Sequence, residues 1–202
     1  INITGTGWMI TNNVVRSGNI AVNNNGNLVI QNNIFDSSFP FTSNQTSVVI
    51  NNNVFMGAIT SYALSNIYNA MITNNIFMGA SPRAATVDNC LFYNNITYQT
   101  SADTIPFANN TGTGNLVAIN PAFTNVLTNT FNYSYDYSLS ATSPGKNAGT
   151  DGKDIGIYGG VMPFVDMTGT PAIPQMKSIT ILNPVIPAGD SLQVIIKAKK
   201  QN

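Results

Sequence analysis

Reactive side chains are scarce in this chain of 202 residues. It contains no histidine, all eight of its acidic residues are aspartates, and charged residues make up only 8% of the sequence. Glycoside hydrolysis usually needs two carboxylates about 5–9.5 Å apart in one cleft. The repeats described below contain few aspartates, arginines or lysines, so the composition argues against a self-sufficient enzyme.

Other absences narrow the possible partners. The single cysteine, Cys90, excludes an internal disulfide, and its place in an apolar pattern predicts a buried, inert thiol. The net charge of zero gives no indication of nucleic acid or of an anionic membrane, and no apolar run approaches the roughly 20 residues of a membrane helix. Asp151 and Asp154 are better explained as turn residues than as calcium ligands, so we expect no metal and no cofactor.

Asparagine takes the place of the missing charge. The chain contains 31 asparagines together with many Thr, Ser and Gly residues, while hydrophobic residues remain at 43%. Normal hydrophobicity with low charge is not the signature of a disordered chain. Small polar residues form helices poorly and turns well, which predicts an all-β fold.

A repeat of about 20 residues organises the first half of the sequence. Five segments align without gaps, each with an Asn-Asn pair after an apolar run: 8–15, 28–35, 48–55, 70–77 and 90–97. The first asparagine of each pair is residue 12, 32, 52, 74 or 94, so the spacings are 20, 20, 22 and 20 residues. Such a unit of short strands and turns can close one coil of a solenoid, with coils stacked about 4.8 Å apart.

Strand periodicity assigns the faces of each coil, because residues two apart share a face. Three apolar columns are predicted to lie inside: Ile10, Ile30, Ile50, Ile72 and Phe92; Trp8, Leu28, Val48, Ala70 and Cys90; and Val15, Phe35, Phe55 and Phe77. A polar column is predicted to face water: Thr11, Gln31, Asn51, Thr73 and Tyr93.

The asparagine pairs mark the bend of each coil. A structural ladder of stacked amides is predicted from the first asparagine of each pair or its immediate successor: Asn12, Asn32, Asn52, Asn74 and Asn94. Asparagine also tolerates the left-handed backbone that a sharp corner needs. A leucine-rich repeat has a similar period, but its Leu-x-Leu-x-x-Asn spacing is not found here.

These repeats resemble the right-handed parallel β-helix superfamily, which includes pectate lyases and many secreted bacterial proteins. Residues 112–123 (GTGNLVAINPAF), 136–149 (DYSLSATSPGKNAG) and 154–160 (DIGIYGG) look like the closing segment of such proteins. Asn120 and Ser138 replace the Asp and His that are usual in the family. The resemblance implies a right-handed parallel β-helix of about five coils over residues 1–160, located outside the cell or on the bacterial outer surface.

The two ends of the chain differ from this pattern. Residues 161–202 are rich in proline and contain two alternating runs, 178–182 and 192–198, which predict a small C-terminal β appendage. At the start, the chain enters a full repeat without a distinct cap. We therefore expect either missing N-terminal coils or a protein partner at that open end.

Two apolar columns are predicted to face outward: Met9, Val29, Val49, Met71 and Leu91, and across the bend Val14, Ile34, Val54, Ile76 and Ile96. A soluble monomer rarely leaves a contiguous apolar stripe uncovered. The tail from Val161 onward or a partner protein could cover each stripe, and we expect a partner on at least one.

A few exposed side chains suggest further roles. Tyr93 and Tyr98 lie in outward columns and are candidates for stacking on glycan, with packing under the C-terminal segment as the alternative. Arg16 and Asp36 occupy one repeat position in successive coils, which predicts an exposed ion pair. Asp103-Thr104-Ile105 resembles an O-glycosylation motif of secreted Gram-negative proteins.

We hypothesise that the chain is a non-catalytic extracellular or cell-surface module that binds glycan or a protein partner within a larger surface assembly. The alternative is the C-terminal portion of a polysaccharide lyase or glycoside hydrolase whose catalytic coils lie upstream.

Overall fold

The computed structural model describes residues 2–3, 7–16, 21–22, 27–36, 41–43, 47–165, 175–183 and 185–199. Their secondary structure consists of strands and turns without a helix, so no described helix could cross a membrane. The chain divides into two units, Ile1–Val165 and Asp166–Asn202, which are described separately. The predicted all-β fold with a stacked, parallel solenoid is confirmed.

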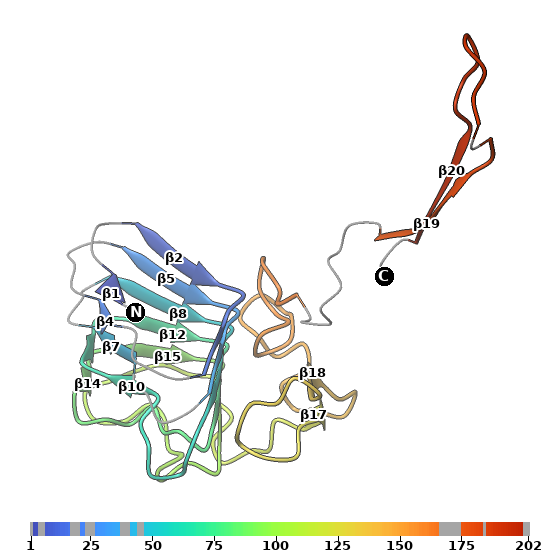
Figure 1. Cartoon of the computed structure of the whole chain (residues 1–202). Coiled ribbons are helices and arrows are strands. Elements are labelled where there is room, and N and C mark those ends of the chain that lie inside the picture. Colours follow the sequence, from blue (N-terminus) through green and yellow to red (C-terminus); the bar gives the residue numbers. More distant parts are fainter. Residues whose placement is uncertain are drawn as a thin grey trace. The chain divides into compact units, whose positions relative to one another are not determined.

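The first sheet is built from the residues that precede each Asn-Asn pair (Figure 1). Its strands are β2 (Trp8–Thr11), β5 (Leu28–Gln31), β8 (Val48–Asn51), β12 (Met71–Thr73) and β15 (Leu91–Tyr93). All neighbours are parallel and in register, so residues at one repeat position lie side by side along the stack.

The second sheet follows the bend at each asparagine pair. Its strands are β3 (Val14–Val15), β6 (Ile34–Phe35), β9 (Val54–Met56), β13 (Ile76–Met78) and β16 (Ile96–Tyr98), again parallel and in register. Single bridges from Leu91 to Thr111 and from Ile96 to Leu116 extend both stacks by part of a further layer.

Shorter strands form the third side of the coil. Four of them pair in the order β1 (Asn2–Ile3), β4 (Ala21–Val22), β7 (Phe41–Ser43) and β10 (Leu64–Ser65), and β11 (Ile67–Tyr68) pairs with β14 (Val87–Asp88). The three sides enclose an apolar core that contains the predicted interior columns with one exception. Trp8, predicted to lie inside, is 48% exposed, because the first described coil has only one neighbouring coil to pack against it. Phe35, Phe55 and Phe77 stack in this core with ring centroids 4.9 Å apart.

The two asparagines of each pair have different tasks. The first has a left-handed backbone in every repeat, with φ of 56° at Asn12 and 54° at Asn52, and therefore makes the bend. The second forms the ladder: Asn13, Asn33, Asn53, Asn75 and Asn95. Asn115, which follows Gly114, extends the ladder by one layer. The Oδ1 atom of Asn53, for example, accepts hydrogen bonds from the main-chain N and the Nδ2 of Asn33, both at 3.0 Å.

The prediction named the first asparagine of each pair or its immediate successor, and the structure assigns the ladder to the successors. Asn12, Asn32, Asn52, Asn74 and Asn94 stand at the bend instead. Because the first asparagine turns the chain, its own amide is directed away from the core, and its successor occupies the interior position. The central part of the ladder is fully inside the protein, since Asn33, Asn53, Asn75 and Asn95 are 0% exposed, whereas Asn13 in the first coil is exposed.

Residues 116–165, called here the covering segment, lie along the outer face of the second sheet. They contain one short antiparallel pair, β17 (Phe123–Asn125) and β18 (Asp136–Leu139). Their apolar side chains form a second core with the outer face of the second sheet, separate from the core inside the coils. The second sheet therefore has one apolar layer on each of its faces, the coil core inside and the covering segment outside.

The second unit contains an antiparallel hairpin of β19 (Gln175–Ile181) and β20 (Val194–Lys199). Ile179 pairs with Ile196 and Ile181 with Val194. This hairpin confirms the predicted C-terminal β appendage.

Candidate binding surface

The outer column, defined as Met9, Val29, Val49, Met71 and Leu91, runs across all five strands of the first sheet. Three of its members are strongly exposed, Met9 at 52%, Met71 at 45% and Leu91 at 38%. Val29 and Val49 are half-buried between them. The chain thus presents a continuous aliphatic stripe along the stack, as the sequence pattern predicted.

A shallow groove of about 410 Å³ follows this column. Its lining is contributed by three neighbouring coils and part of a fourth: Asn27, Leu28, Val29, Ser47, Val48, Val49, Asn69, Ala70, Met71 and Leu91. No charged side chain is among these residues. The groove therefore has an aliphatic floor and neutral polar groups at its side.

Amides and hydroxyls border the stripe. On one side, Asn69 and Asn89 precede Met71 and Leu91 by two residues, and the Nδ2 of Asn89 donates to the Oδ1 of Asn69. On the other side lies the polar column that was predicted to face water, of which Gln31 and Thr73 are buried instead. The Thr73 hydroxyl donates to the Oδ1 of Asn51 at 2.9 Å. These groups can donate and accept hydrogen bonds without introducing charge.

The second column that was predicted to face outward, on the second sheet, is not exposed to solvent. Ile34, Val54, Ile76 and Ile96 are 0% exposed, and Val14 is half-buried. Side chains of the covering segment pack on them, namely Phe131, Tyr137, Leu139, Ile155, Ile157 and Phe164. The expectation of a partner on this column is therefore corrected: the same chain covers it, mainly with residues that precede Val161.

The bend asparagines hold this cover in place. The Nδ2 of Asn32 donates to the carbonyl oxygens of Ile157 and Gly159 at 2.8 and 2.9 Å, and the Nδ2 of Asn52 donates to that of Gly156 at 3.0 Å. Asn94 donates to Ala148 O at 2.7 Å in the same way. Repeated amides thus bind the main chain of an irregular segment.

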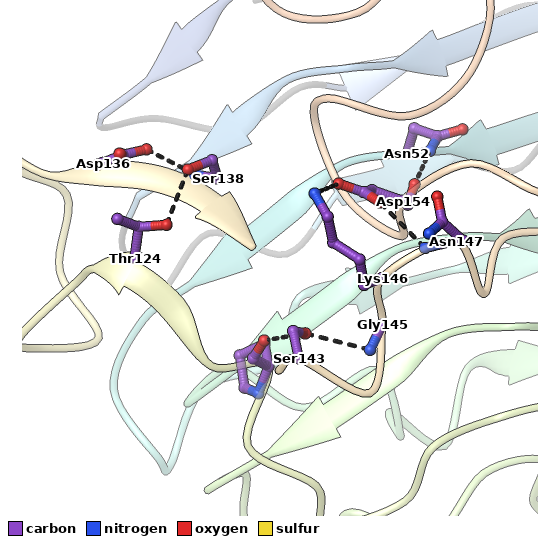
Figure 2. Close-up of polar contacts among 10 residues, drawn as sticks. Asn52, Thr124, Asp136, Ser138, Ser143, Gly145, Lys146, Asn147 and Asp154 are labelled. Carbon is purple, nitrogen blue, oxygen red and sulfur yellow. Dashed lines mark hydrogen bonds and ion pairs between the residues drawn. The ribbon is translucent and has the colours of Figure 1, made fainter. Parts of the chain in front are cut away.

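Charged groups in the covering segment serve its own turns. Figure 2 shows Lys146, Asn147 and Asn52 converging on Asp154. The Lys146 Nζ donates to one carboxylate oxygen at 2.8 Å, and the Asn147 main-chain N donates to the other at 3.0 Å. Asp154 is therefore engaged in holding a turn, as predicted.

Several other charged side chains and the cysteine are also engaged or buried. Arg16 lies 3.5 Å from Asp36, which confirms the predicted pair, although Asp36 itself is buried and also accepts from the main-chain N of Phe131. Asp88 accepts from Asn109. Burial raises the pKa of the Cys90 thiol above its ordinary value, which keeps the thiol protonated and unreactive. The described residues contain no group of three or more potential metal ligands.

The two candidate tyrosines lie in different surroundings. Tyr93 ends the polar column of the first sheet, beside Thr73. Tyr98 packs against the second core and borders a small hollow of about 240 Å³ together with Gln99, Asn120 and Leu127. The structure does not bring the two rings together on one strand, because Tyr93 belongs to β15 and Tyr98 to β16.

Sequence reasoning missed the polar side of the groove. Asn66, Asn69 and Asn89 have left-handed backbones, with φ of 53° to 55°, at a second bend of the coil. The sequence did contain a signal for this second bend, namely the isolated asparagines two residues before Met71 and Leu91. Comparison with protein-family models, with curated proteins and with solved structures gives no match to the chain.

Proposed function

We propose that this chain is a non-catalytic module of an extracellular or cell-surface protein, and that it binds a partner through the outer face of its first sheet. The outer column carries this proposal. It is a five-residue aliphatic stripe with three strongly exposed members, and contiguous apolar patches of this kind usually mark interaction sites.

The chemistry around the column favours binding over catalysis. A reaction centre needs a nucleophile, an acid or a base within reach of a substrate. The groove is lined by aliphatic side chains, asparagines and a serine, with no charged group. Methionines such as Met9 and Met71 adapt their shape to a partner surface because they are unbranched and flexible.

The architecture supports the proposed location. A parallel solenoid with buried asparagine stacks has the features of the right-handed β-helix superfamily that the sequence resembles. That superfamily contains many secreted and surface proteins, which supports placing this module outside the cell and within a larger surface assembly.

A binding screen with matched variants tests the proposal. The full chain is screened against an array of neutral and acidic glycans and against a displayed library of random peptides, and the hits are remeasured with Met71→Asp. Val161→Asp is the control, because Val161 is 84% exposed on the covering segment and lines neither the groove nor the hollow beside Tyr98. At least one ligand should lose about tenfold or more in affinity with Met71→Asp and none with Val161→Asp.

Two results would contradict the proposal. One is that no glycan or peptide binding responds to Met71→Asp. The other is turnover of pectin, alginate or a glycosaminoglycan by this chain alone, which would favour an enzyme.

A further inference from the structure

Both parallel sheets carry the same three-residue device on their outer faces. A left-handed asparagine is followed by a residue that points into the coil and then by an aliphatic residue that points out. On the second sheet this device is Asn32-x-Ile34 or Asn52-x-Val54, and on the first sheet it is Asn69-x-Met71 or Asn89-x-Leu91. The backbone angles agree closely, with φ of 54° at Asn52 and 53° at Asn69.

On the second sheet the device has an occupant that shows what it binds. Residues 148–164 of the covering segment lie there as an irregular polypeptide strap. Ile155 and Ile157 pack on the aliphatic column, and the carbonyl of Gly156 between them accepts from the Asn52 amide at 3.0 Å. The device therefore recognises an aliphatic side chain and a main-chain carbonyl together.

Glycine lets the strap approach this closely. A Cβ atom on Gly156 would lie 2.7 Å from the Cδ1 of Ile76, and one on Gly159 would lie 2.4 Å from the Asn52 Nδ2. A side chain at Gly156 would press on the aliphatic column and strain a backbone with φ of 94°, and one at Gly159 would collide with the Asp154 carbonyl and the Asn52 amide. An aliphatic–glycine–aliphatic sequence is thus the pattern that fits the device.

On the first sheet the same device lacks a strap within the described residues. Met71 and Leu91 are exposed, whereas their counterparts Ile76 and Ile96 are fully buried. The Asn69 Oδ1 is occupied by the Asn89 amide, but the Asn69 Nδ2 has no hydrogen-bond acceptor among the described residues. The groove thus combines an uncovered aliphatic floor with an available amide donor.

We propose that the first-sheet groove binds an extended polypeptide segment with an aliphatic–glycine–aliphatic pattern, and that the Asn69 amide donates to a main-chain carbonyl of that segment. This inference rests on the proposed function and names the chemistry of the partner. The established contact of the strap with the second sheet is its template. The uncharged lining selects a segment without charged side chains, because an unpaired charge would be desolvated there.

Peptide selection followed by one isosteric substitution tests this inference. A phage-displayed library of random dodecapeptides is selected on the full chain, and enriched sequences are synthesised for measurement of Kd. Asn69→Asp replaces the amide donor by a carboxylate oxygen while keeping the acceptor for Asn89 and a residue that tolerates the left-handed backbone. Asn66→Asp is the matched control, because Asn66 has the same φ of 53° and does not line the groove.

Selected peptides should contain aliphatic residues around glycine, and Asn69→Asp should weaken their binding about tenfold while Asn66→Asp leaves it within about twofold. Met71→Asp should abolish the binding. Unchanged denaturation midpoints would show that the variants remain folded.

Other outcomes overturn the inference in distinguishable ways. If no peptide is recovered, or if peptide binding ignores Asn69→Asp, the carbonyl-binding role is wrong. If only glycans bind and Met71→Asp removes that binding, the inference fails while the proposed function stands. If nothing that binds responds to Met71→Asp, both fail.

Discussion

The second sheet and the first sheet of the solenoid present similar aliphatic columns to very different surroundings. The column on the second sheet is sealed by the covering segment, with Ile76 at 0% exposure, while its counterpart Met71 on the first sheet is 45% exposed. The difference does not arise from hydrophobicity, since both positions hold large apolar residues. It arises from what a distant part of the chain does, because residues 131–164 reach only one of the two faces.

This comparison separates stability from recognition. A column that the chain covers itself contributes to folding, since its burial is part of the native state. An uncovered column contributes little to folding and remains available to another molecule. The same strand pattern can therefore serve either purpose, and substitutions at the two columns should have opposite consequences.

The largest contrast is expected between Ile76→Ala and Met71→Ala in the same coil. Ile76→Ala should lower the free energy of unfolding by about 4 kcal/mol, because it opens a cavity between the second sheet and the covering segment. Met71→Ala should lower it by less than about 0.5 kcal/mol, because its side chain is already exposed. Urea unfolding followed by circular dichroism measures both values. Equal losses would show that the first sheet is also covered in solution.

Periodicity predicted most of the fold: the repeat indicated the strands, their register and the interior columns apart from Trp8, which is exposed in the first coil. Strand alternation gives the direction of a side chain, however, and not what lies beyond it. Val54 and Val49 both alternate outward, and only the tertiary position of Ile155 and Ile157 distinguishes them. For the same reason, the pattern could not assign the ladder to Asn53 and the strap contact to Asn52, because that choice depends on the bend between them.

The two asparagines of one pair allow a second test, because one of them, Asn53, bonds inside the coil and the other, Asn52, bonds to the strap. Asn53→Ala should cost about 3 kcal/mol, since it removes a fully buried amide that donates to Ile30 and Asn51 and accepts from Asn33. Asn52→Gly keeps the left-handed bend and loses only the strap contacts, so about 1 kcal/mol is expected. Hydrogen exchange should show the difference in location. Asn52→Gly should speed exchange in residues 154–160 without affecting the first sheet.

The covering segment should also contribute a loss of stability at high pH through Tyr137. Desolvation by burial raises the pKa of Tyr137 to about 12 in the folded protein, compared with 10 for an ordinary tyrosine. The unfolded chain therefore loses this proton first as the pH rises, so the contribution of Tyr137 to stability is constant below about pH 10 and is lost between pH 10 and pH 12. Urea midpoints across this range measure the decline. Tyr137→Phe should flatten it, and a decline of unchanged size in that variant would assign the effect to another group.

The smallest effect is expected at the Arg16–Asp36 pair, where the covering segment meets the edge of the stack. The ion pair spans 3.5 Å with an exposed arginine, so Arg16→Ala should cost less than about 0.5 kcal/mol. Asp36→Ala should cost about 1–2 kcal/mol, because it also removes the acceptor for the buried main-chain N of Phe131, 2.9 Å away. This difference would indicate that Asp36 stabilises the protein more through its hydrogen bond to the covering segment than through the ion pair with Arg16. Urea unfolding at low and high salt distinguishes the two roles: only the small arginine contribution should be screened, and equal, salt-sensitive losses in both variants would show that the ion pair dominates.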